Sequence, residues 1–216
     1  GTLADAWRED DRTGTSHSFA QVAIPHPSGL HVLVLATNPL HTEVLEPTRV
    51  ADAAAAARAF YDFVILDLHP DFGPLNLALF YLGDRILVPV TPDLPCILAA
   101  VQFREVATAM EMRERLVMVM NRANSGVSPS RVERTVALPT LARIRSAGML
   151  FTQASNDGGS VVERYPNSKA ASDIERLVDR LIMAIDSGDN RKLSQSPRLG
   201  IAESVRNLIG RLTVQR

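Results

Sequence analysis

Short apolar runs that alternate with helical segments are the feature that most constrains the fold of this chain. Continuous apolar runs, rather than period-two stripes, are typical of strands that are buried on both faces. Alternation of such strands with helices is typical of a parallel sheet. The sequence therefore predicts an α/β fold with a mostly parallel sheet and helices on both faces. The expected strands are His31–Thr37, Phe63–Leu68, Arg85–Thr91, Arg115–Asn121 and Ala142–Arg145.

Helices are expected between and around these strands, and the composition changes near the C-terminus. Residues 187–200 are mostly small or polar and predict a flexible linker, and residues 201–216 predict an amphipathic helix. The predicted organisation is a domain over 1–186, a linker over 187–200 and a C-terminal helix over 201–216. A loop is expected at 10–29, and helices are expected at 2–9, 48–61, 75–82, 94–112, 128–137, 146–153 and 168–185.

Composition disfavours a nucleic-acid-binding protein and excludes a protein with an intrachain disulfide. With 216 residues, 46% of them hydrophobic, the chain has enough apolar residues for a large core. The net charge of −1 provides no global attraction to nucleic acid or membrane, and most arginines lie among acids. Because Cys96 is the single cysteine, no intrachain disulfide can form, and this low cysteine content is typical of proteins in the reducing cytoplasm. We therefore expect a cytoplasmic protein and no nucleic-acid partner.

An acidic residue follows the second apolar run. Asp67 ends that run and is followed by a turn that contains Pro70 and Gly73. Open parallel sheets bind their ligands outside the carboxyl ends of the strands. A carboxylate there can hold a magnesium ion or its water. The pattern predicts a ligand site at Asp67, and a structural turn cap is the plainer interpretation.

Several longer segments together resemble one family from about Leu3 to Leu181. They read YDFVILDLHPDFG, GDRILVPVTPDLPCILAA, RLVMVMNRAN and ERYPNSKAASDIERLVDRL. In order and spacing the chain resembles MinD/ParA-type P-loop ATPases, and most of all the branch related to the CpaE/TadZ pilus-assembly proteins. The resemblance implies a cytoplasmic ATPase of the deviant Walker A class. Such proteins sandwich ATP between two subunits and use the nucleotide to switch dimerisation and attachment to partners or membrane.

The resemblance also implies roles for individual residues. Asp67 matches the Walker B acid of the magnesium shell. The segment Pro70–Gly73 matches the second switch region, which senses the γ-phosphate, and Gly73 is its expected site residue. The expected cofactors are ATP or ADP with Mg²⁺. The expected partners are a second copy or related subunit and proteins of a polar apparatus. Near the nucleotide the family pattern places Asn121, Arg122, Thr91, Pro92 and Pro166.

One part of the family pattern is missing. The motif K-G-G-x-G-K-T is absent, and the only lysines are Lys169 and Lys192. Without a glycine loop and its lysine, the phosphates have no cradle. We therefore expect a fragment or a degenerate member, which by itself hydrolyses ATP poorly or not at all.

Three functions are weighed on these residues. The leading one is a nucleotide-dependent switch that positions a pilus, secretion or division apparatus. The second is a non-catalytic scaffold of the same fold that recruits partners. The third is a receiver-like phosphoacceptor domain with Asp67 as acceptor and Thr91 as switch hydroxyl. That chemistry needs a lysine where this chain has Asn121 and Arg122, which disfavours it.

The predicted C-terminal helix has an apolar face and basic flanks. From Ser187 onward there are six basic and two acidic residues, a local charge of 6 − 2 = +4. Such a helix binds an anionic membrane surface, as a peripheral attachment, or docks on protein. Both interpretations stay open at this point. The residues concerned are Ile201, Val205, Leu208, Ile209 and Leu212 on the apolar side, with Arg206 and Arg211.

Plainer interpretations stand beside the functional ones. Asn121 also suits a simple turn at a strand end, and Asp71 suits a solvated loop. Cys96 is expected to be buried and inert, and Met110, Met118 and Met120 to fill the core. The histidines lack metal-ligand spacing, so no histidine metal site is predicted.

Overall fold

The computed structural model describes residues 1–38, 40 and 45–186 of the chain. These residues form two compact units, Gly1–Leu82 and the part from Gly83 onward. The predicted linker, 187–200, and the predicted helix, 201–216, lie outside the described residues.

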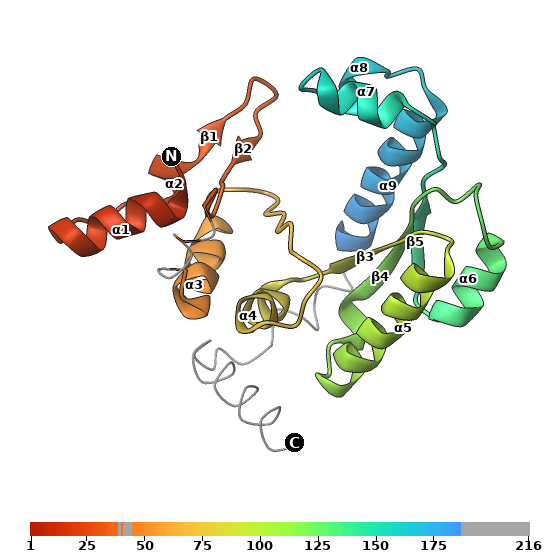
Figure 1. The fold of residues 1–216 in the computed structure, drawn as a ribbon, viewed down its shortest axis with the longest axis horizontal. Helices are drawn as coiled ribbons and strands as arrows, with labels where there is room; N and C mark the ends of the chain where they lie inside the picture. Colours follow the sequence, from red (N-terminus) through yellow and green to blue (C-terminus); the bar gives the residue numbers. More distant parts are fainter. Residues whose placement is uncertain (39, 41–44, 187–216) are drawn as a thin grey trace. The chain divides into compact units, whose positions relative to one another are not determined.

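The first unit is a small cluster of helices with one short hairpin (Figure 1). The N-terminus of α1 is closed by a capping box in which Thr2 and Asp5 satisfy each other's backbone N–H groups. The core is built from α1, α3 and α4, with Leu3, Val50 and Leu79 almost fully buried. The elements are α1 (Leu3–Thr13), α2 (Phe19–Val22), β1 (Ile24–Pro25), β2 (His31–Val32), α3 (Pro47–Ala57) and α4 (Pro74–Leu82).

Two strands expected in this unit are not formed as predicted. Of the run 31–37, only His31 and Val32 pair, antiparallel to Ile24 and Pro25. The carbonyls of Val34 and Leu35 instead accept hydrogen bonds from the first N–H groups of α1, at 2.9 Å each. Residues 63–68 lie in no helix or strand, and no ladder joins them to another described residue. An apolar run favours a strand only where a neighbouring strand is available, and local pattern does not reveal that neighbour.

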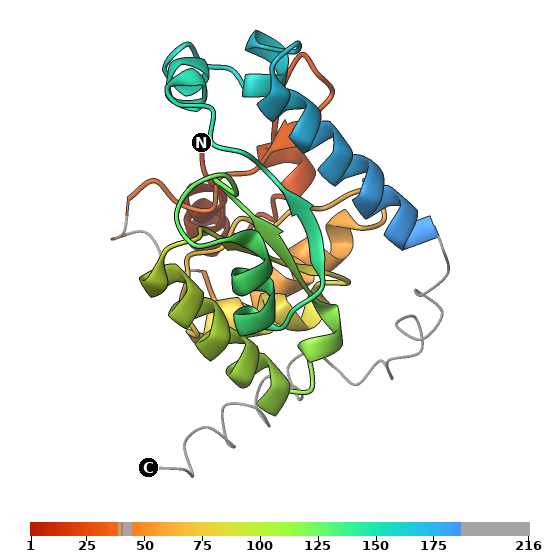
Figure 2. The same cartoon turned by 90° about the vertical axis from the view of Figure 1, so that its right-hand side faces the viewer.

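The second unit confirms the α/β prediction. Its three strands are parallel in the order β3-β4-β5, as expected for buried apolar runs. Figure 1 shows α5 and α6 on one face of this sheet and α9 on the other, and Figure 2 shows this unit from the side of α5 and α6. The elements are β3 (Ile86–Val90), α5 (Leu94–Ala109), the 3₁₀ turn η2 (Arg113–Arg115), β4 (Leu116–Met120), α6 (Pro129–Val136), β5 (Thr140–Arg143), α7 (Leu150–Asn156), α8 (Val161–Arg164) and α9 (Lys169–Asp186).

The core of this unit contains the predicted methionines. Met118 and Met120 are fully buried and Met110 is nearly so. The fifth strand begins two residues earlier than expected, at Thr140. Its register with β4 shifts between Met118 and Val119, which leaves Leu141 as an extra residue in β5.

Helix ends differ from the prediction where the backbone turns. α5 ends at Ala109 rather than 112, because the chain reverses through Glu111 in the left-handed region, φ 59°. The helix expected at 146–153 lies at Leu150–Asn156, and α8 was not predicted. α8 is a single turn, held by a capping box between Ser160 and Glu163.

Candidate functional site

The loops that follow β3 and β4 meet at the carboxyl edge of the sheet. The N–H of Asn121 donates to the carbonyl of Val90 (2.9 Å), which continues the pairing of β4 with β3. The N–H of Val127 then donates to the carbonyl of Pro92, also at 2.9 Å. The structure therefore brings together four of the predicted site residues, Thr91, Pro92, Asn121 and Arg122, in the second unit.

Close approach of the two loops depends on Gly126. Its backbone is left-handed, with φ 71°, and a Cβ built there would lie 2.1 Å from the carbonyl oxygen of Pro92. Only glycine fits such a contact without displacing the backbone. Arg122 also has a positive φ, 51°, at the start of the same loop. Backbone geometry of this kind, outside the favoured regions, is concentrated at functional loops.

A short polar network holds the loop after β3. The hydroxyl of Thr91 donates to the carboxylate of Asp93, which also caps α5 by accepting from the N–H of Cys96 at 3.0 Å. The Thr91 hydrogen bond, followed by the Cys96 N–H, lowers the pKa of Asp93. Cys96 is half-buried, and its sulfur accepts from the N–H of Thr91 at 3.2 Å. It therefore has a structural role here.

The third strand end joins the same edge. The N–H of Ala123 donates to the carbonyl of Ile144 (2.9 Å), and Asn124 Oδ1 accepts from the N–H of Ser146 (2.6 Å).

Asn121 is exposed, and its Oδ1 accepts from the N–H of Arg122 at 2.9 Å. That bond uses the amide oxygen and leaves the NH₂ group available as a donor. An adenine ring nitrogen is an acceptor of the kind such a group binds.

Pro166 lies in the exposed turn before α9. The helix is fastened to the end of β5 by Asp173, which is buried. Asp173 accepts from the N–H of Arg145 at 3.1 Å and from its guanidinium at 2.6 and 3.0 Å. These hydrogen bonds place the start of α9 beside the segment that follows β5.

Asp67 and Gly73 belong to the first unit. Asp67 is exposed and has no hydrogen bond or ion pair with another residue in the described part of the chain. A carboxylate with no competing partner suits Mg²⁺, which keeps several waters and takes one or two protein carboxylates. The described residues contain no group of three or more metal-ligating side chains. Asp67 as a magnesium ligand stays a prediction.

The turn between Asp67 and α4 is organised by a residue that sequence reasoning missed. Asn76 is 6% exposed, and its amide donates to the carbonyl of His69 (2.6 Å) and to Asp71 Oδ1 (3.0 Å). The N–H of Gly73 donates to the same Asp71 oxygen at 2.7 Å. Asp71 is exposed, as expected for a solvated loop residue, and in addition it organises the turn. The signal was present as a lone asparagine in the apolar helix PLNLALFYL.

The structural comparisons are consistent with one another. A ParA family ATPase from Chlorobium tepidum matches with a TM-score of 0.71 and 23% identity, over 83% of this chain and 74% of that one. The cell division ATPase MinD of Pyrococcus furiosus matches with a TM-score of 0.73 and 17% identity, over 85% and 76%. The chain has the ParA/MinD ATPase fold. MinD from Pyrococcus horikoshii, solved with Mg-ADP, matches this ParA/MinD fold at 16% identity over 86% of this chain and 74% of that one, with a TM-score of 0.72.

A sequence relative points the same way. The cell division protein PomZ of Myxococcus xanthus is 28% identical over 145 residues, which covers 62% of this chain and 45% of PomZ. The chain thus spans less than half the length of this relative. No protein-family model matches the chain. The part of the ParA/MinD fold that the structure describes contains no helix long and apolar enough to cross a membrane.

Proposed function

We propose that this chain acts in a ParA/MinD-type nucleotide-dependent switch that positions a pilus, secretion or division apparatus. Within that group we assign it to the branch related to CpaE/TadZ. The observation that carries the proposal is the convergence of Thr91, Pro92, Asn121 and Arg122 at the carboxyl edge of a parallel sheet. Ligands of open α/β sheets bind at this edge.

The proposed roles follow from the chemistry of each residue. Asn121 and Arg122 contact the base, with Pro166 near it, and the loop of Thr91 and Pro92 borders the nucleotide. Asp67 holds Mg²⁺ through water, and Gly73 senses the γ-phosphate through the turn that Asp71 and Asn76 organise. A bound magnesium ion would offset the charge of the phosphates.

Catalysis is a separate question from binding. The chain has no glycine-rich loop with a lysine, and its two lysines are Lys169 and Lys192. A lysine and backbone amides normally neutralise charge during phosphoryl transfer. We propose that this polypeptide binds nucleotide but by itself hydrolyses ATP poorly or not at all. The alternative, a non-catalytic scaffold of the same fold, is favoured by the same missing lysine.

Titration with a fluorescent ADP analogue in the presence of Mg²⁺ separates these functions. We expect saturable binding to the full chain. Asn121→Ala should weaken this binding about tenfold, because one hydrogen bond is lost and its desolvated partner on the ligand is left unpaired. Asn156→Ala, at the exposed end of α7, is the matched control and should change nothing. Asp67→Asn should weaken the magnesium dependence, with the upstream Asp62→Asn as its control.

The outcomes distinguish the alternatives. Absence of binding at millimolar ADP would leave only the scaffold. Robust phosphate release that Asp67→Ala abolishes would overturn the proposal of poor hydrolysis.

Partners and location are proposed on the same basis. One matching structure, from Aquifex aeolicus, is a complex of MinC with MinD, and it has a TM-score of 0.66 and 16% identity. For this chain we propose a second copy or a related subunit as partner, and proteins of a polar apparatus beside it. We propose a cytoplasmic location, with peripheral attachment to anionic membrane through 201–216. These residues lie outside the described part.

A further inference from the structure

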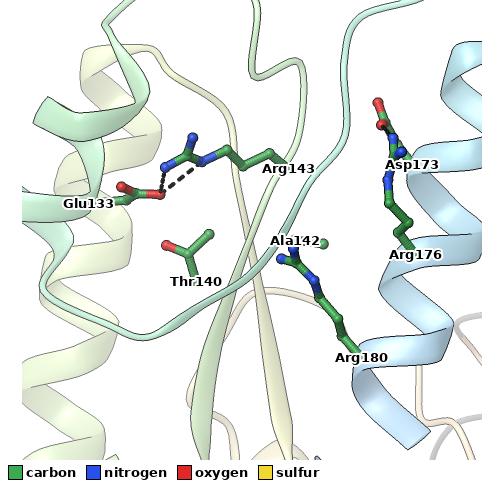
Figure 3. A pocket seen from close by; sticks show the side chains of 7 residues that line it. All are labelled: Glu133, Thr140, Ala142, Arg143, Asp173, Arg176 and Arg180. Carbon is green, nitrogen blue, oxygen red and sulfur yellow. Dashed lines mark hydrogen bonds and ion pairs between the residues drawn. The ribbon is translucent and has the colours of Figure 1, made fainter. Parts of the chain in front are cut away.

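A pocket of about 370 Å³ lies in the second unit between α6, β5 and α9 (Figure 3). Its charged lining consists of Arg143, Arg176 and Arg180, with Glu133 and Asp173. α9 runs antiparallel to β5, since Asp173 bonds Arg145 beyond the strand end while Arg180 bonds Leu141 inside the strand. The pocket therefore extends back along β5, away from the carboxyl edge described above.

The arginines of this pocket outnumber the acids that they neutralise. Asp173 is 4% exposed, and its two oxygens accept three hydrogen bonds from Arg145 in addition to one from Arg176. The guanidinium of Arg145, which lies outside the lining, thus balances Asp173 and leaves Arg176 in excess. Arg143 is paired with Glu133, through bonds of 3.0 and 2.6 Å to one oxygen.

Arg180 is the second excess charge. Its Nη1 donates to the carbonyl of Leu141 at 2.9 Å, and the structure gives it no carboxylate partner among the described residues. Leu141 is the extra residue of the β5 bulge, so its carbonyl lacks a regular ladder partner. The bulge therefore fixes the guanidinium at the pocket and leaves its other N–H groups to donate.

Counted together, the cluster has a positive excess. Arg143, Arg145, Arg176 and Arg180 stand against Glu133 and Asp173, so that 4 − 2 = +2 in a chain of net charge −1. Glu175 and Asp179 stand on α9 as well, but they do not line the pocket. Structural ion pairs that fasten α6 and α9 to β5 explain Arg143 and Arg145. Arg176 shares Asp173 with Arg145, and Arg180 is held by a backbone carbonyl, so the pocket lining contains two further arginines without a carboxylate of their own.

We propose that this pocket binds the phosphate group of a small phosphomonoester. A phosphate monoester carries close to two negative charges at neutral pH, which matches the excess. Guanidinium groups bind phosphate with paired N–H donors. The volume suits a small metabolite, since ligand pockets are commonly about 300–1,000 Å³.

Figure 3 shows how the donors are placed. Arg143 extends from β5, while Arg176 and Arg180 extend from α9 on the other side. The side chain of Thr140, on β5, lies at the same pocket, and its hydroxyl is a further donor for a phosphate oxygen. Arg176 has 56% of its side chain exposed, so it can turn toward a ligand while Arg145 continues to neutralise Asp173.

The test is a titration of the full chain by ³¹P NMR and calorimetry. The probes are inorganic phosphate and glycerol 3-phosphate, with glycerol as the uncharged control, at constant ionic strength. Arg180→Gln and Arg176→Gln should each weaken binding about tenfold, because each removes a charge-assisted donor. Glu133→Gln should strengthen binding, since it frees Arg143. Arg134→Gln, an exposed arginine of α6 outside the lining, makes the same charge change and should have no effect.

Each outcome decides the proposal. Saturable binding of both phosphates, with losses confined to the pocket variants, supports it. No saturable binding by the wild type, or equal losses with Arg134→Gln, overturns it. Binding of inorganic phosphate but not of glycerol 3-phosphate would overturn the assignment of a phosphomonoester as the ligand. Binding of duplex DNA, and of neither small anion, would overturn the assignment of the pocket as a small-molecule site. Circular dichroism of each variant excludes unfolding as the cause of a loss.

Discussion

Gly126 is the residue on which the carboxyl edge of the second unit most depends. Replacement by alanine would place a Cβ 2.1 Å from the Pro92 carbonyl oxygen, in a left-handed backbone. We expect Gly126→Ala to lower the free energy of unfolding by about 3 kcal/mol, because strain and displaced backbone add. Urea denaturation measures this cost, and the nucleotide titration should weaken with it.

Gly148 provides the matched control for that change. It too has a left-handed backbone, φ 58°, but no atom lies within 4 Å of its built Cβ. Gly148→Ala should therefore cost only the backbone term, about 1 kcal/mol. Equal costs at the two glycines would show that the close approach to Pro92 has no energetic weight.

Asp173 makes a pH-dependent contribution to stability. The side-chain hydrogen bonds of Arg145, followed by its N–H and those of Arg176, lower the pKa of Asp173 from 3.8 to about 2. A lowered folded-state pKa stabilises the fold above the unfolded pKa, and this stabilisation is lost as the pH falls through the folded value. Asp173→Asn should cost roughly 2–3 kcal/mol at pH 7. The difference between variant and wild type should shrink between pH 4 and 2.

Urea denaturation at stepped pH follows that difference. Asp179→Asn, an exposed acid on the same helix, should show no such pH dependence. A difference between wild type and Asp173→Asn that stays constant down to pH 2 would contradict the assigned ion pair.

At the scale of elements, residues 63–66 are the exposed apolar segment of the first unit. Ile65 is 85% exposed and Phe63 is 53% exposed, and the backbone of 63–67 has no hydrogen bond to another described residue. An exposed apolar segment with unpaired N–H and C=O groups is a template for strand pairing between molecules. We expect Ile65→Lys to raise the concentration at which the protein aggregates by about twofold or more, measured by light scattering.

A second exposed apolar residue tests whether the backbone matters. Leu98 is 52% exposed, but it lies on α5, where the backbone groups are already paired. Leu98→Lys should change aggregation much less than Ile65→Lys. Similar effects of the two substitutions would attribute aggregation to apolar area alone.

The same segment shows what local pattern can predict. β3, β4, α4, α5, α6 and α9 lie within a few residues of their expected bounds, because each carries its own apolar periodicity and caps. The runs 31–37 and 63–68 have equally good strand patterns, but among the described residues the first pairs only at His31 and Val32 and the second has no ladder partner. Pairing is a property of two segments, so one run cannot reveal it.

The candidate site follows the same division. Thr91, Pro92, Asn121 and Arg122 were predicted from the family resemblance, and the parallel pairing of β3 with β4 explains why the residues that follow these strands share one edge. The roles of Gly126, Asn76 and Arg180 depend on a close approach, a buried turn and a one-residue shift of register. Such features arise only when separate segments pack, so the residue types alone indicated these three roles only weakly.

At the scale of the whole molecule, charge is distributed unevenly along the chain. The net charge is −1, and residues 187–216 carry +4, so residues 1–186 carry −1 − 4 = −5. These basic residues lie in and around the stretch 201–212, which contains the predicted apolar face. We expect the full chain to co-sediment with anionic vesicles, and a chain that ends at Asn190 to lose most of this binding.

The interaction should combine two terms that variants can separate. Each basic residue near an anionic surface contributes about 1 kcal/mol, and this term falls with salt, while the apolar face adds a term that salt does not screen. Arg206→Gln with Arg211→Gln should therefore weaken binding at low salt more than at high salt. Leu208→Ser should weaken it at both. Equal sedimentation of the full chain and the shortened chain would remove the membrane and leave docking on protein as the role of this segment.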